Sequence, residues 1–316
     1  MKRTATALVV IAWSSLMLAQ QPAPAPTGQK SLPSAPQAGS SQAGAAAQAG
    51  AAATPPAKHP PQAKTQAEYD AYNATVAVLK DPATAKDPMA FAKAADDFAT
   101  KFPDSELRIL LFKQSMRIFR DANNSTQVEA AAEKILKIDP DDPEALVAAA
   151  EVITEHVHPD TDLDAEQRFA QAAKYASHAV ETIDTDVSIP AGTPQEKVDA
   201  YKGFLRSSAY SVLGTISFNQ EKYPDAENYF RKSIDALPSQ PDPVVVLRLA
   251  IALDKQNKYP EALKVANNAV QLTQENSMAG KLARQERDRL VQLTGGSAPA
   301  PAAAPAGGAA QNPPSH

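Results

Sequence analysis

The stretch KYPDA at residues 222–226 decides the fold of this chain, because it recurs 36 residues later as KYPEA at residues 258–262. Self-similarity at a fixed period is typical of proteins built from stacked supersecondary units, each of which buries its apolar face against its neighbours. Both copies contain a proline where a helix would begin, a position at which its missing N–H is no loss. The repeat therefore predicts stacked helical units.

The clearest unit, residues 207–240, shows which positions pack. Its two helices carry bulky, small and aromatic residues at fixed spacing: Tyr210, Leu213 and Gly214, then Ala226 and Phe230. The small residues Gly214 and Ala226 predict that the paired helices cross closely, with larger side chains filling the space around the crossing. This pattern resembles the tetratricopeptide repeat. The resemblance implies an all-α fold, a right-handed α-solenoid of antiparallel helix pairs.

The pattern continues on both sides of this unit. A second well-matched repeat covers residues 243–274, and weaker matches upstream bring the total to about five helix pairs, followed by a capping helix at 277–294. Two departures from the period are expected. One is an inserted loop at 156–164, and the other is a long helix that reaches Asn219. The resemblance covers roughly two-thirds of the chain.

Two helix starts in this region carry the sequence of a capping box. Asp164 is followed three residues later by Gln167, and Thr193 is followed by Glu196. In such a box the first side chain accepts a hydrogen bond from a backbone N–H of the first turn. The acidic or amide side chain three residues later accepts one from the backbone N–H of the first residue. We therefore expect side-chain caps at Asp164 and Thr193.

Residues 1–19 have the form of a secretion signal. They begin with two basic residues and then run apolar to the small residue Ala19. The apolar stretch is about 15 residues long, shorter than the roughly 20 that a membrane helix needs. We expect cleavage after Ala19 and a periplasmic or other envelope location. Retention of the segment as a membrane anchor is the alternative.

Two further segments are too poor in large apolar residues to fold. Residues 20–64 and 295–316 consist mainly of Ala, Pro, Gln, Gly and Ser. Such segments cannot bury enough surface to offset the ordering of their backbone, about 1–2 kcal/mol per residue. We expect a disordered linker and a disordered tail around one folded solenoid at 65–294.

Charge and cysteine content exclude several classes of function. The chain has 31 basic and 36 acidic residues without a basic stripe, which argues against nucleic-acid binding. It has no cysteine, so disulfides, thiolate metal sites and thiol nucleophiles are excluded. No phosphate-binding loop, histidine pair on a helix or nucleophile elbow is present. We expect neither an enzyme nor a cofactor.

The inserted loop concentrates histidines and carboxylates, which are residue types that can ligate a divalent metal ion. Its alternating carboxylates resemble the start of a calcium loop, but Ala165 stands where the sharp turn needs glycine and Gln171 where a bidentate glutamate is needed. The favoured interpretation is a solvated acidic loop, and no metal site is expected.

A peptide groove is the sharper functional prediction. In tetratricopeptide proteins the first helix of each pair lines the concave surface. The resemblance places two charged bands there: Lys113, Arg117 and Arg120, then Glu144, Glu151 and Glu155. Adjacent bands of opposite charge could orient an extended peptide. The alternative is that both are ordinary solvated helix faces. The lysine–asparagine clamp of some family members is missing, because Arg117 occupies the asparagine position.

The sequence therefore predicts a non-enzymatic scaffold or adaptor of the cell envelope that binds a protein or peptide. Two alternatives stay open. One is a membrane-anchored structural protein with an uncleaved N-terminus, and the other is a cell-wall-active enzyme with paired carboxylates. The partner, the pathway and the oligomeric state are not encoded in any motif.

Overall fold

A computed structural model describes residues 61–81, 84, 87–190 and 192–295. The predicted signal peptide, nearly all of the linker and nearly all of the tail lie outside these residues. The described part of the chain forms eleven α-helices and no strand. Their bounds are α1 Gln66–Ala77, α2 Pro88–Lys101, α3 Leu107–Asp121, α4 Ser125–Leu136, α5 Pro143–His156, α6 Ala165–Asp186, α7 Gln195–Asn219, α8 Tyr223–Ala236, α9 Pro243–Lys255, α10 Tyr259–Leu272 and α11 Met278–Thr294.

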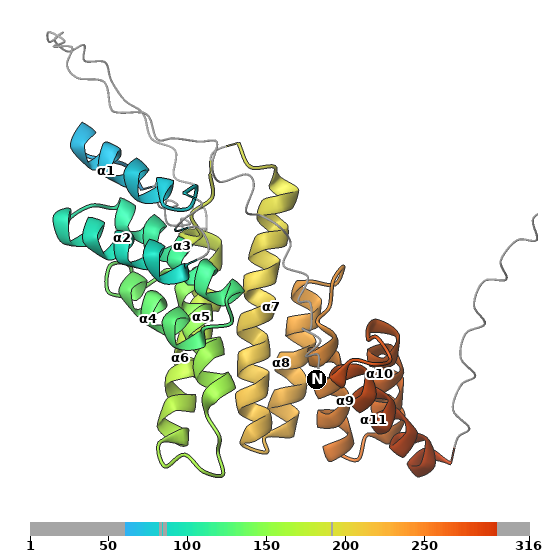
Figure 1. Ribbon diagram of the computed structural model, residues 1–316. Coiled ribbons are helices and arrows are strands. Elements are labelled where there is room, and N and C mark those ends of the chain that lie inside the picture. Colours follow the sequence, from blue (N-terminus) through green and yellow to red (C-terminus); the bar gives the residue numbers. More distant parts are fainter. Residues whose placement is uncertain (1–60, 82–83, 85–86, 191, 296–316) are drawn as a thin grey trace, which may run out of the picture. The chain divides into compact units, whose positions relative to one another are not determined.

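The helices pack in chain order, as a solenoid requires. The chain divides into two compact units, and the boundary between them along the sequence falls between Pro241 and Asp242. In the first unit each helix from α1 to α8 packs against the next (Figure 1), and α5 also packs against α7. In the second unit α9, α10 and α11 pack against one another. The predicted all-α fold of five helix pairs and a final helix is confirmed, as are the inserted loop before α6 and the long helix α7.

Three of the helix pairs turn in the same way. The residues Asn123, Glu221 and Asn257 adopt positive φ angles of 53°, 58° and 59° between the two helices of their pairs. The next residue then bonds back to the end of the first helix, as when the Lys222 N–H donates to the Ser217 carbonyl at 2.9 Å and the Lys258 N–H to the Leu253 carbonyl at 3.0 Å. These are Schellman-type ends, which satisfy carbonyls that would otherwise have no partner.

The close crossing predicted at Gly214 is confirmed. A Cβ atom at Gly214 would lie 2.5 Å from Cδ1 of Phe230, whose ring is fully buried. One period later the equivalent positions hold Ala250 and Ala266, also fully buried. The two repeats thus fill the same crossing differently. The first combines a missing side chain with a large one, and the second combines two small ones.

Both predicted capping boxes are wrong, although the helices begin where expected. Asp164 precedes α6 and Pro194 precedes α7, and neither start has a side-chain cap. The Thr193 hydroxyl instead donates to the Pro190 carbonyl at 2.7 Å. The backbone of Asp164 (φ −103°, ψ 11°) lies outside the extended region in which an N-cap side chain reaches the first turn.

By their spacing, four large apolar residues of α11 lie near one another on the helix: Met278, Leu282, Leu290 and Leu293. Only Leu290 is buried. The other contacts of α11 use small residues, Gly280 and Ala283, and a Cβ atom at Gly280 would lie 1.9 Å from the Gln274 carbonyl oxygen. Because α11 approaches its neighbours through these small residues, three larger apolar side chains stay exposed.

Candidate functional site

The two charged bands predicted from the sequence lie on α3 and α5, and the structure pairs them with each other. Lys113 Nζ lies 3.4 Å from Glu144 Oε2, and Arg117 Nη2 lies 2.9 Å from Glu144 Oε1. Further along, Arg120 Nη2 lies 3.4 Å from Glu151 Oε2. Spacings of three and four residues place the α3 cations on one face of that helix, and this face meets the carboxylates of α5. Opposite charges therefore neutralise each other between the two helices.

Two residues outside the predicted bands complete this network. Asp142 caps α5 by accepting a hydrogen bond from the Ala145 N–H at 3.0 Å, and its other carboxylate oxygen lies 2.6 Å from Lys113 Nζ. From α7, Tyr201 hydrogen-bonds with both Glu144 and Arg117. Asp142 could have been found as a polar residue directly before a helix-starting proline. Tyr201 carries no local signal, because only the packing of α5 on α7 brings it here.

The network is buried, which sets its electrostatics. Burial by itself would raise the pKa of Glu144, but the attraction of Lys113 and Arg117 and the hydrogen bonds from Tyr201 and Arg117 outweigh it and lower that pKa to about 2. Burial would lower the pKa of Lys113, yet the carboxylates of Glu144 and Asp142 raise it. Both groups are therefore charged at neutral pH. The network joins α3, α5 and α7, and removing one of its buried charges would leave the opposite charge without its counter-charge.

The bands become more open to solvent away from Lys113 and Glu144, and Arg117, with its side chain 36% exposed, is intermediate. The side chains of Arg120 and Glu151 are 40% and 30% exposed, whereas Lys113 and Glu144 are buried. Glu155 lies one turn beyond Glu151 and is exposed. The predicted groove residues thus separate into a buried inner set and an accessible outer set.

A concavity in the first unit lies between α2, α3 and α4. It has a volume of about 590 Å³. Its apolar lining combines alanines with two phenylalanines and a methionine: Met89, Ala90, Phe112, Phe119, Ala130 and Ala131. Met89 is half exposed at its edge. The sequence analysis missed this groove, because its residues share a surface only after three helices pack.

The two lysines on the rim of this groove are paired with carboxylates, and the third carboxylate there, Asp87, accepts the Met89 N–H at the start of α2. Lys134 Nζ lies 2.6 Å from Asp96 Oδ1 and 5.4 Å from the centre of the Phe112 ring, within range of a cation–π contact. Lys93 is paired with Asp97 at 2.6 Å on the neighbouring turn. The groove therefore offers mainly apolar contact, with fixed charges at its edge.

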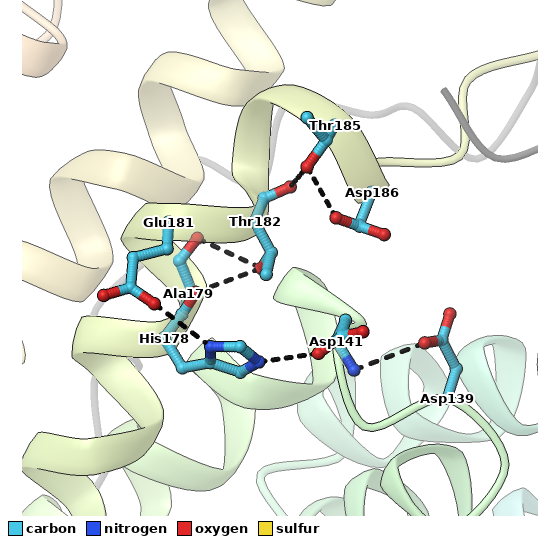
Figure 2. Close-up of polar contacts among 8 residues, drawn as sticks. All are labelled: Asp139, Asp141, His178, Ala179, Glu181, Thr182, Thr185 and Asp186. Carbon is cyan, nitrogen blue, oxygen red and sulfur yellow. Dashed lines mark hydrogen bonds and ion pairs between the residues drawn. The ribbon is translucent and has the colours of Figure 1, made fainter. Parts of the chain in front are cut away.

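A third polar cluster is centred on His178 of α6. Figure 2 shows its ring between two carboxylates, with Nε2 2.7 Å from Asp141 Oδ1 and Nδ1 3.3 Å from Glu181 Oε2. Asp141 lies in the loop between α4 and α5, so the histidine joins α6 to that loop. The hydrogen bond to Asp141, assisted by Glu181 and opposed by partial burial, raises the pKa of His178.

This cluster predicts a small pH dependence. The pKa of His178 is higher in the folded chain than its ordinary value of 6.5, so its contribution to stability is complete below about pH 6.5 and is lost as pH rises through the folded value. The pair is solvent-exposed, so the contribution is below about 1 kcal/mol. Denaturant unfolding of the wild type and of His178→Asn should show their difference shrinking from about pH 5.5 to about pH 8.5. A difference that grows with pH would contradict this assignment.

The inserted loop does not assemble metal ligands. His156 is held through both ring nitrogens, 2.9 Å from the Val152 carbonyl and 2.8 Å from the Ser125 hydroxyl. The His158 N–H donates to the Asp162 carboxylate at 2.9 Å. In the part of the chain that the structure describes, no group of three His, Cys, Asp or Glu side chains converges as a metal site. Among the same residues, no helix is long and apolar enough to cross a membrane.

No protein-family model and no curated protein matches the chain. Similar solved structures include the assembly chaperone of RpL4 (Acl4, residues 1–338), at 14% identity and a TM-score of 0.39 over 72% of this chain and 98% of that one. PilF of Pseudomonas aeruginosa is 19% identical, with a TM-score of 0.30 over 60% of this chain and 93% of that one. These TM-scores are low, so the fold assignment rests on the helix pairing and crossings of this chain.

Proposed function

We propose that this chain is a non-enzymatic, protein-binding scaffold, and that its main binding surface is the groove between α2, α3 and α4. The observation that carries the proposal is the lining of that groove. Alanines on α2 and α4 let another backbone approach closely, the largely buried Phe112 and Phe119 form the floor, and Met89 offers apolar contact at the edge. Methionine suits such a surface because its flexible side chain adapts to different partners.

The partner that fits is a polypeptide segment carrying apolar side chains. The two lysines at the rim are already paired with carboxylates, so they supply little attraction for a charged ligand. An amphipathic helix or an extended segment could place two or three apolar side chains into a groove of about 590 Å³. Binding would then depend on shape and apolar burial more than on salt concentration.

The groove can be tested with a random peptide library selected on the full chain. Ala130→Trp fills the groove, and we expect the affinity of selected peptides to fall by about tenfold or more, measured by fluorescence anisotropy. The matched control is Thr126→Trp, which places the same side chain at an exposed position one turn earlier on α4. Peptides that bind both variants equally, or peptides without apolar residues, would argue against the groove.

The outer end of the charged bands is a second candidate surface. This surface combines Arg120 of α3 with Glu151 and Glu155 of α5. All three are accessible, so both signs of charge are presented close together. Arg120→Glu tests this surface without touching the buried network, because Arg120 pairs with Glu151 and not with Glu144. If the selected peptides bind this variant as they bind the wild type, the charged bands do not contribute to recognition.

We propose further that the scaffold is exported to the cell envelope with residues 1–19 removed. The basic start, short apolar stretch and small Ala19 support this. The only tryptophan, Trp13, lies within that segment. Protein purified from its natural compartment should therefore lack tryptophan fluorescence, and its intact mass should correspond to a start at Gln20. Retention of Trp13 would favour the anchored structural protein instead.

A further inference from the structure

The last helix, α11, leaves an apolar strip uncovered in the second unit. Met278 is 74% exposed, Leu282 46% and Leu293 50%. At 100° per residue these three side chains fall within about 60° of the helix circumference, beside the buried Leu290 and Ala283. Met278 and Leu282 lie in the first turns of the helix and Leu293 near its end, with the exposed Gln285 and Arg289 between them. Such a row of large apolar side chains on a soluble surface commonly marks an interaction site.

The polar residues beside the strip are arranged symmetrically about its middle. Lys281 and Asp288 are exposed on the same flank, on either side of the exposed Gln285, and Asp288 also pairs with Arg287 of its own helix at 2.6 Å. A second copy of the helix, turned antiparallel about Gln285, therefore places its apolar ends opposite the apolar ends of the first helix. Its Asp288 then lies opposite Lys281. This order is self-complementary, and a charged face complementary to itself favours association with its own copy.

We propose that α11 pairs in antiparallel fashion with α11 of a second copy of this chain, about a two-fold axis at Gln285. Met278 of one copy then packs on Leu293 of the partner subunit, and Lys281 lies beside Asp288 of the partner subunit. Leu282 faces Arg289 of the partner subunit. The Arg289 guanidinium is held by Asp254 and Glu286 of its own copy, so its aliphatic stem is available for packing.

The contact is small, which sets its expected strength. About eight residues of α11 are exposed on each copy, against the 20–30 per side of a standard interface. We therefore expect a weak, reversible dimer with a dissociation constant of about 1 µM to 1 mM. Such a dimer would double the number of binding grooves in each particle, and so raise the avidity for a repeated partner.

Cross-linking tests the register directly, because the chain has no native cysteine. In the full chain, Gln285→Cys places two thiols across the two-fold axis, and mild oxidation should yield a disulfide-linked dimer. Lys264→Cys is the matched control, at an exposed position on α10. The proposal predicts that the 285 variant links much faster than the 264 variant. Equal rates would overturn it.

Charge exchange tests the contact without cross-linking. In sedimentation equilibrium, Lys281→Asp and Asp288→Lys should each weaken the dimer, and the double variant should restore it. Leu282→Glu should weaken the dimer by about tenfold or more while leaving the folded helix content unchanged, because Leu282 is exposed. A chain that is monomeric at all concentrations would overturn the proposal. A dimer that survives Leu282→Glu, or is lost on removing 297–316, would overturn it too.

Discussion

Replacing Glu144 by Gln is expected to lower the free energy of unfolding by about 3–5 kcal/mol. The carboxylate of Glu144 is buried and faces both Lys113 and Arg117. Glutamine keeps the shape of the side chain but removes its charge, so the buried Lys113 keeps only the carboxylate of Asp142 and the partly exposed Arg117 loses the carboxylate of Glu144. Leaving a buried charge without its counter-charge is among the most destabilising single changes known.

The matched control is Glu151→Gln on the same helix. Its pair with Arg120 is longer and half-exposed, and we expect a loss of no more than about 1 kcal/mol. Urea unfolding followed by circular dichroism measures both variants. If Glu144→Gln and Glu151→Gln lower the free energy of unfolding by similar amounts, the buried network stabilises the fold no more than a surface ion pair does.

The pH dependence of the wild type gives an independent check on Glu144. Its pKa falls from 4.5 to about 2 on folding. A lowered carboxylate pKa stabilises the folded state above the unfolded value, and this stabilisation is lost as pH falls through the folded value. Glu144 should therefore contribute about 3 kcal/mol that disappears between about pH 4.5 and pH 2. The Gln variant should be less sensitive to pH in that window.

The repeat period was enough to predict the paired helices, because small residues at fixed spacing report directly on helix crossings. It placed Gly214 against its partner helix and located the inserted loop and the long α7. The charged bands were also assigned to the right helices. What the period could not supply was the separation of those helices, and therefore whether the charges face solvent or each other.

Residues contributed by distant helices stayed hidden for the same reason. Tyr201 reaches Glu144 only because α7 packs on α5, and no local pattern marks an interior tyrosine as a hydrogen-bond donor. On α11, apolar size suggested a packed side, but close approach selected Gly280 and Ala283 instead. Helical periodicity shows which residues share a face, whereas the distance between helices decides which face is buried.

The crossing of α7 and α8 yields the second large effect. Truncating the fully buried Phe230 to Ala should lower the free energy of unfolding by about 3–5 kcal/mol, since it removes a large ring and leaves a cavity. Gly214→Ala should cost about 1–3 kcal/mol in the wild type, because its Cβ atom would meet the ring at 2.5 Å. Chemical denaturation measures both.

The double variant makes the sharper test, since it recreates the pair that the next repeat already uses, Ala250 and Ala266. Once the ring is gone, the methyl group of Gly214→Ala fills part of the cavity, and alanine also favours the helix over glycine by about 1 kcal/mol. The same substitution should therefore destabilise the wild type and stabilise the Phe230→Ala background, a coupling within the range of about 0.5–3 kcal/mol seen for residues in contact. An effect of the same sign in both backgrounds would show that Gly214 is small for some reason other than Phe230. A reversed sign would show that two repeats of this chain solve one packing problem with different pairs of volumes.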